Sequence, residues 1–200
     1  MVRAALVTLL ALASLAAAPA RTVPPGPVPS VSAPAPAPSR YLAPEEARDL
    51  LLDAARAGDL DVVSGLVRAG VSMELADAKG YTALILAAYH GHDPVVAWLI
   101  THGADACHGD KRGNTALMGA AFKGHSESVD LLLAQDCPVD QVNGVGQTAL
   151  MFAALVGNDA AARILAHGAD KARRDSFGRT ADDWAETQGA PGVSELRPAE

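Results

Sequence analysis

One short pattern returns four times along this chain at an almost constant spacing. Threonines recur 33, 33 and 32 residues apart, and a glycine stands two residues before each of them. The threonines are Thr82, Thr115, Thr148 and Thr180, and the glycines are Gly80, Gly113, Gly146 and Gly178. A period of this length indicates a stack of small units, each of which contacts only its neighbours.

Each unit is expected to be a turn followed by two short helices. Glycine enters the left-handed region of a turn without steric cost, and the threonine after it is a preferred N-cap. The apolar run that follows predicts the first helix, and Gly91, Gly124 and Gly157 predict where that helix ends. Asp93 followed by Pro94 predicts the start of a second helix, with Asp93 as its cap. Neither helix is long enough to bury its own apolar face, so the units must stack.

Three segments carry the unit in full, at 77–105, 110–138 and 143–170. They resemble the ankyrin repeat, whose pattern runs from a turn through T-P-L-H and a first helix to G-H, a second helix and G-A-D. The resemblance implies an all-α solenoid of stacked helix-turn-helix units with β-turn fingers. The ankyrin-repeat domain then covers 44–189, with an N-terminal capping repeat at 44–76, three full repeats at 77–109, 110–142 and 143–174, and a C-terminal capping repeat at 175–189.

The chain departs from the family pattern at several positions. Alanine replaces the proline after each threonine, and the histidine two positions later is replaced by Ile85, Met118 and Met151. We therefore expect the contacts between repeats to depend more on apolar packing. The third full unit is one residue shorter than the others between Gly157 and Gly168, which predicts a shortened second helix and a small kink there.

Both ends of the array are expected to be capped by polar residues. The stretch 44–57 is expected to bury Leu50, Leu51 and Ala54 and to expose its charged residues. In the last unit, Asp182 replaces the leucine of the other units and Asp183 follows it, so we expect these carboxylates on the outer face. Terminal repeats need such polar faces for solubility. Residues 190–200 have the composition of a disordered tail.

The first forty residues are expected to lie outside the repeats. A positive start at Arg3, an apolar stretch at 4–15 and the sequence Ala-Pro-Ala at 18–20 fit a Sec-type signal peptide at 1–20. An uncleaved N-terminal anchor is the alternative, although the stretch is short for a transmembrane helix. Residues 21–43 are a Pro/Ala-rich linker, better explained as a spacer than as a specific proline-rich ligand. We expect a bacterial protein that is periplasmic or secreted.

Export would place Cys107 and Cys137 in an oxidising compartment. They stand 30 residues apart, three short of the period, so they do not occupy equivalent positions. Neighbouring helices pack about 10 Å apart, whereas a disulfide needs Cα atoms within about 7 Å of each other. We therefore expect two separate thiols in the loops between units, with an intramolecular disulfide as the alternative.

Charge and motifs restrict the possible classes of function. All 23 acidic residues follow Tyr41, whereas three of the 16 basic residues precede it, so the repeats are more acidic than the net charge of −7. That balance argues against nucleic acid and against an anionic membrane surface as partners. The sequence contains no P-loop, no G-x-S-x-G, no H-E-x-x-H and no dinucleotide-binding fingerprint, so we do not expect an enzyme.

The histidines leave a second class of function open. His92 and His125 follow the glycine at the helix turn, where the ankyrin pattern uses histidine structurally, and no Cys/His cluster has zinc spacing. An alternative reading joins His90 with His102 or His108 in a transition-metal or haem site, as in a periplasmic stress-protection protein. The structural role is favoured, and we expect no cofactor.

The resemblance implies a concave groove lined by finger tips and by exposed positions of the first helices. Carried over to this chain, the tip residues are Lys79, Tyr81, Lys111, Arg112, Asn114, Val145, Gln147, Phe177 and Arg179. The helix residues are Tyr89, His90, Phe122, Lys123, Leu155 and Val156. Aromatic residues and arginine are enriched in protein interfaces, although Phe122 and Leu155 have the alternative of packing within their own domain. We expect a non-enzymatic, monomeric adaptor whose partner protein presents an acidic and partly apolar patch.

Overall fold

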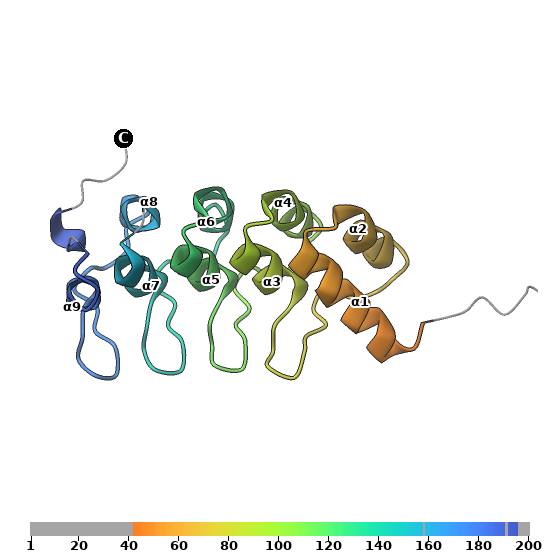
Figure 1. Ribbon diagram of the computed structural model, residues 1–200, viewed down its shortest axis with the longest axis horizontal. Coiled ribbons are helices and arrows are strands. Elements are labelled where there is room, and N and C mark those ends of the chain that lie inside the picture. The colour runs from red at the N-terminus through yellow and green to blue at the C-terminus, as the bar shows by residue number, and fades with distance from the viewer. Residues whose placement is uncertain (1–41, 158, 191, 196–200) are drawn as a thin grey trace, which may run out of the picture. The chain divides into compact units, whose positions relative to one another are not determined.

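The repeats fold into pairs of short helices joined by long turns (Figure 1). The computed structural model describes residues 42–157, 159–190 and 192–195; the expected signal peptide and nearly all of the linker lie outside them. The first helices of the pairs are α1 (Pro44–Ala57), α3 (Ala83–His90), α5 (Ala116–Lys123), α7 (Ala149–Val156) and α9 (Ala181–Glu186). The second helices are α2 (Leu60–Arg68), α4 (Asp93–Thr101), α6 (Ser126–Leu133) and α8 (Ala160–Ala166). A short 3-10 helix, η1 (Val193–Glu195), follows α9.

The first helices form one row and the second helices another, and the turns before α3, α5, α7 and α9 project as fingers from the first row (Figure 1). Each first helix contacts the next one in the row, and α2, α4, α6 and α8 do the same. Two consecutive alanines in each middle first helix are buried, namely Ala87 and Ala88, Ala120 and Ala121, and Ala153 and Ala154. Small side chains let neighbouring helices approach closely. The helix pairs stack in two rows, so the predicted all-α solenoid is confirmed.

The predicted helix ends are confirmed in the middle repeats. The side-chain oxygen of each repeated threonine accepts a hydrogen bond from the backbone N–H three residues later, at 3.3 Å for Thr115 and Met118. Gly91, Gly124 and Gly157 end their helices in the left-handed conformation. The threonine and glycine register therefore sets the boundaries of α3, α5 and α7.

The start of the second helix differs from the prediction by one residue. His92 is the N-cap residue of α4, and Asp93 is the first residue of the helix rather than its cap. The Asp93 carboxylate instead accepts a hydrogen bond from the Ser128 hydroxyl of α6, so it links two repeats. The predicted shortening of the third unit is confirmed, because α8 has 7 residues where α4 has 9 and α6 has 8.

At both ends of the array the structure differs in part from the prediction. In α1, Leu51 and Ala54 are buried as expected, but Leu50 is 43% exposed. The buried stripe continues from Ala47 to Leu51 and Ala54, at the spacing of three and four that a helix face requires, and Leu50 falls outside it.

The expected disorder after Gly189 is wrong for residues 192–195. Val193 is 1% exposed, and the Asp182 carboxylate accepts hydrogen bonds from the backbone N–H of Ser194, at 3.0 Å, and from its hydroxyl. Asp182 therefore faces the folded C-terminal segment rather than open solvent. Among the described residues α9 is followed only by η1, which packs on it, so Val193 supplies apolar contact that a second helix gives elsewhere.

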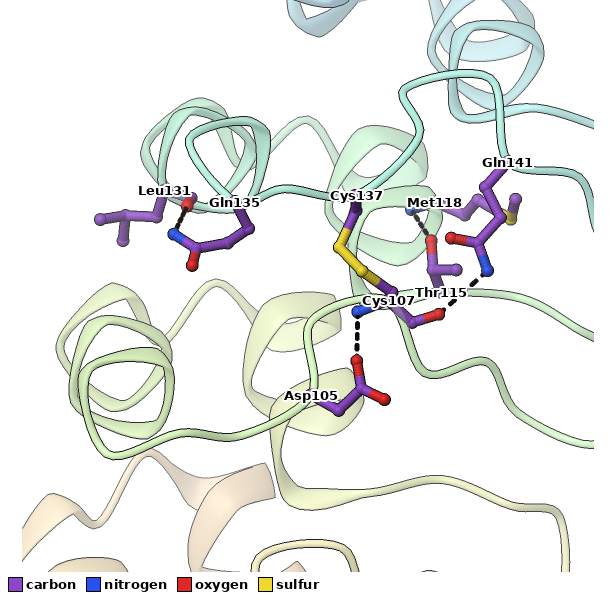
Figure 2. Close-up of a disulfide and its surroundings, with 8 residues drawn as sticks. All are labelled: Asp105, Cys107, Thr115, Met118, Leu131, Gln135, Cys137 and Gln141. Atoms are coloured by element: carbon purple, nitrogen blue, oxygen red, sulfur yellow. Dashed lines mark hydrogen bonds between the residues drawn. A yellow bond between two sulfur atoms is a disulfide. The ribbon is translucent and has the colours of Figure 1, made fainter.

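Cys107 and Cys137 form a disulfide, so the expectation of separate thiols is wrong (Figure 2). Their Cα atoms are 5.4 Å apart. The spacing between repeats applies to equivalent positions, and the counterpart of Cys137 in the preceding repeat is Ala104. Cys107 lies three residues farther along the loop, and three extended residues span about 10 Å. The Gln141 side-chain amide also donates to the Cys107 carbonyl at 2.9 Å, which ties the same two loops together.

Among residues 42–157, 159–190 and 192–195, no helix has the length and apolar character needed to cross a membrane.

Candidate functional site

The fingers are closed by one carboxylate or amide side chain each. Asp77, Asp110, Asn143 and Asp175 occupy equivalent positions, and the Oδ1 atom of each accepts backbone N–H groups two and four residues later. For Asp110 the donors are Arg112 and Asn114, both at 2.8 Å. The polar groups of each turn are thus satisfied inside the finger, which holds the tip in one conformation.

Consecutive fingers are joined by backbone hydrogen bonds. The N–H of Lys111 donates to the carbonyl of Lys79 at 3.0 Å, and the N–H of Gly144 donates to Arg112 at 2.7 Å. A third bond runs from Ser176 to Val145. Gly80 has a φ of 87°, and a Cβ atom there would lie 2.6 Å from the Lys111 nitrogen. Glycine is required at this position both by its conformation and by the close approach of the next finger.

A groove of about 610 Å³ lies between the fingers and the first helices. Nine of the predicted residues line it: Lys79, Tyr81, Tyr89, His90, Arg112, Asn114, Phe122, Gln147 and Leu155. Aromatic rings form much of its floor. The ring of Phe122 meets that of Phe152 edge to face at a centroid distance of 6.1 Å, and Tyr89 is 37% exposed. Phe122 is half-buried and lines the groove, so it packs within its own domain while part of its ring faces the groove.

Basic side chains lie along the same groove. Lys79 and Arg112 are exposed, and within the described part of the chain neither forms an ion pair with a carboxylate. The Lys123 ammonium lies 5.1 Å from the centroid of the Tyr89 ring. Asp77 and Asp110 line the groove too; Asp110 is buried, Asp77 is half-buried, and both accept hydrogen bonds from their own fingers. The exposed charges of the tips are therefore positive on an otherwise acidic protein.

Arg179 has a different environment from the other predicted cations. Its guanidinium pairs with the buried Asp175 carboxylate at 2.9 Å and lies 3.8 Å from the centroid of a Trp184 ring. Burial raises the pKa of Asp175, but the hydrogen bonds from Arg179 and Phe177 and the charge of Arg179 outweigh it, so the pKa lies below 3.8. Arg179 therefore links the last finger to α9.

The histidines near the helix turns link neighbouring repeats. A ring nitrogen of His92 bonds the carbonyl of Arg56 at 2.9 Å, and one of His125 bonds the carbonyl of Tyr89 at 3.2 Å. Their predicted structural role is confirmed. Burial lowers the pKa of His90, and the nearby His92, Arg56, Lys123 and His125 lower it further. Among the residues that the structure describes, no group of three His, Cys, Asp or Glu side chains has an arrangement that could hold a metal ion.

A family model described as ankyrin repeats (3 copies) matches residues 51–143 and 120–196. The chain belongs to the ankyrin-repeat family. No curated protein matches it. Ankyrin repeats generally serve as protein–protein interaction modules, and the family is typically non-enzymatic.

Six of the predicted residues lie outside the lining of the ankyrin groove: Lys111, Lys123, Val145, Val156, Phe177 and Arg179. Phe177, at the tip of the last finger, is 71% exposed, and its ring lies under the Arg179 guanidinium at 4.9 Å. Val145 is 37% exposed and Val156 43%. These three apolar side chains are exposed but do not line the groove.

The sequence interpretation missed one row of residues on the groove floor. Leu86, Gly119, Phe152 and Trp184 line the groove, and they occupy the same position in α3, α5, α7 and α9. In the three full ankyrin repeats this position varies, whereas the two residues after it are always alanine. Variation beside fixed alanines was the available signal, and it marks a position whose side chain differs from repeat to repeat: Leu86 is buried in the core, whereas Phe152 and Trp184 are only partly buried.

Proposed function

We propose that this ankyrin-repeat protein binds one partner protein through the groove between its fingers and first helices. The partner presents an acidic and partly apolar patch, and the protein acts as a monomeric adaptor without catalytic activity. The observation that carries the proposal is the placement of the exposed Lys79 and Arg112, which form no ion pair among the described residues, beside the aromatic floor.

The floor and the tips would contribute differently to such a complex. Tyr89 and Phe122 offer flat apolar surface that loses contact with water when a partner covers it. Exposed cations at the rim contribute more to the rate and the selectivity of association than to its free energy. A partner with carboxylates around an apolar centre matches both features.

We also propose that the protein is exported to the periplasm or secreted. The signal-like pattern at 1–20 supports this location, and so does the Cys107–Cys137 disulfide, since structural disulfides persist in oxidising compartments. Cell fractionation with N-terminal sequencing of the mature protein tests the location. Recovery of the intact chain from the cytoplasm with both thiols free would contradict it.

Site-specific photo-crosslinking in living cells, read out by mass spectrometry, tests the groove. A photoreactive residue at Gln147 should capture a partner protein, whereas one at Glu127, exposed on α6, should not. The Arg112→Glu variant should lose the crosslink, and the triple variant Tyr89→Ala, Phe122→Ala, Arg112→Ala should lose it with unchanged helical circular dichroism. Capture of the same partner by Arg112→Glu, or capture only from position 127, would overturn the proposal.

A further inference from the structure

The floor of the groove has one position without a side chain. Gly119 in α5 is the counterpart of Leu86 in α3, Phe152 in α7 and Trp184 in α9. The other three positions all carry large apolar side chains. At Gly119 the helix presents its backbone to the groove instead, between the repeats that contribute Tyr89 and Phe152.

Nothing in the fold requires glycine at this position. A Cβ atom there would meet Tyr89 Cβ and Cδ2 at 3.6 Å, an ordinary van der Waals distance, and the backbone is helical. Glycine inside a helix is less stable than alanine, because it loses more backbone freedom on folding. The position therefore carries a residue that weakens α5, although an alanine methyl group would fit against Tyr89.

The space over Gly119 is bordered by apolar and aromatic groups. Tyr89 contacts this position directly, and Phe122, one helical turn later in α5, packs edge to face on Phe152. Thr115, four residues before Gly119 in the sequence, already accepts a hydrogen bond from Met118 and is buried. Surroundings of this kind favour an apolar side chain over a polar one, which would lose its hydrogen bonds to water.

We infer that the space over Gly119 is a pocket for one large apolar side chain, leucine or an aromatic residue, in an acidic segment of the partner. This inference rests on the proposed function and adds the feature that selects the partner. Carboxylates flanking that side chain would meet Arg112 and Lys79, the exposed cations that line the groove in the first two full repeats. Burial of one such side chain corresponds to about ten- to hundredfold in affinity.

The pocket can be tested with peptides before a partner is known. A phage-displayed library of random peptides, each of a dozen residues or so, is selected against the intact oxidised protein, and the enriched peptides are synthesised with a fluorescent label. We expect them to share one large apolar residue flanked by Asp or Glu. Replacement of that residue by alanine should weaken binding to the wild-type protein about ten- to hundredfold. Enrichment of peptides without such a residue would overturn the inference.

Variants of Gly119 that fill the pocket with a side chain provide a second test. Gly119→Leu should lose most of the affinity for the selected peptides, and the alanine substitution in the peptide should have little further effect on this variant. Gly119→Ala should bind with intermediate affinity and unfold at the same temperature as wild type or higher, which separates occlusion from unfolding. Gly65→Ala is the matched control: Gly65 lies inside α2 with open space around it, away from the groove.

The outcomes distinguish the pocket from the groove as a whole. Equal affinity of the peptides for Gly119→Leu and wild type would overturn the pocket, and loss of affinity in Arg112→Glu would then still support binding in the groove. Unchanged affinity in both Gly119→Leu and Arg112→Glu would contradict the proposed function as well.

Discussion

Cys107 and Cys137 are covalently joined across two repeats, although they stand at different positions within those repeats. The bridge connects the loop after α4 with the loop after α6 (Figure 2). These second helices belong to the same two repeats as α3 and α5, which present Tyr89 and Gly119 to the groove. The disulfide therefore fastens together the pair of repeats on which the proposed pocket depends.

Reduction of the disulfide should destabilise the folded protein. The bridge closes a loop with a sequence separation of 30 residues, and loss of such a crosslink lowers the free energy of unfolding by about 2–4 kcal/mol. Urea unfolding monitored by circular dichroism, with and without dithiothreitol, measures the difference. The double variant Cys107→Ser, Cys137→Ser should unfold at the same urea concentration in both conditions. A wild-type midpoint that does not respond to reductant would contradict the structural role of the bridge.

Replacement of an amide by an acid in one finger, or of an acid by an amide in another, should destabilise the protein. Asn143 donates from its amide to the side-chain oxygens of Asn114 and Gln147, so Asn143→Asp places acceptor against acceptor. Asp175→Asn places an amide donor against the donors of Arg179 and Trp184. Each change should lower the free energy of unfolding by about 1–3 kcal/mol.

Asp77→Asn provides the control for this exchange. In the described part of the chain, hydrogen bonds reach only one carboxylate oxygen of Asp77, and an amide oxygen can replace that acceptor. Urea unfolding of the three variants should therefore leave Asp77→Asn close to wild type. An equal loss in all three would contradict this explanation, because Asp77→Asn retains the oxygen that accepts both hydrogen bonds.

Removal of one threonine hydroxyl should weaken α5. Thr115 is buried and its oxygen accepts the Met118 N–H, so Thr115→Ala should lower the free energy of unfolding by about 1–2 kcal/mol. Thr115→Ser retains the hydroxyl and should lose less. Chemical denaturation of both variants makes the comparison; a serine variant as unstable as the alanine variant would assign the effect to the lost methyl group.

The titration of His90 should make stability depend on pH. Burial, followed by the charges of His92 and Arg56, holds the pKa of His90 below 6.5, so the unfolded chain binds the proton more tightly than the folded one. Its contribution to stability is fully present above pH 6.5 and is lost as the pH falls through the folded-state pKa. NMR titration of the imidazole checks the pKa directly.

The His90→Gln variant separates the contribution of His90 to the pH dependence of stability from that of the carboxylates. Between about pH 7 and pH 5, wild type should lose more of its free energy of unfolding than His90→Gln does, because glutamine does not titrate. Parallel pH profiles for the two proteins, or an imidazole pKa above 6.5, would show that the environment of His90 does not disfavour its protonated form.

The features predicted best from the sequence are those set by local chemistry. Thr115 caps a helix and Gly124 ends it because of their own conformational preferences, and each acts within a few residues of its position. The disulfide was missed because it depends on how far the loop after α4 extends toward the next repeat. The burial of Val193 was missed because it depends on which surface α9 leaves uncovered.

Gly119 was missed for a different reason. The groove residues were assigned by carrying over exposed positions of the repeat, and a residue without a side chain offers no chemistry to carry over. Its meaning depends on the neighbours that surround it in the stack, Tyr89 above all, and only the assembled repeats bring them together.

The hydrogen bonds between fingers also determine which of the two binding partners loses conformational freedom when a complex forms. The carbonyls of Lys79 and Arg112 accept the N–H groups of the next finger, so the backbone that carries both cations is fixed before any partner arrives. The entropy lost on association then falls on the partner segment and on two long side chains, while the loops lose almost none. A partner that is itself held in an extended conformation, by proline or by its own fold, should therefore gain more affinity than a flexible segment of identical sequence.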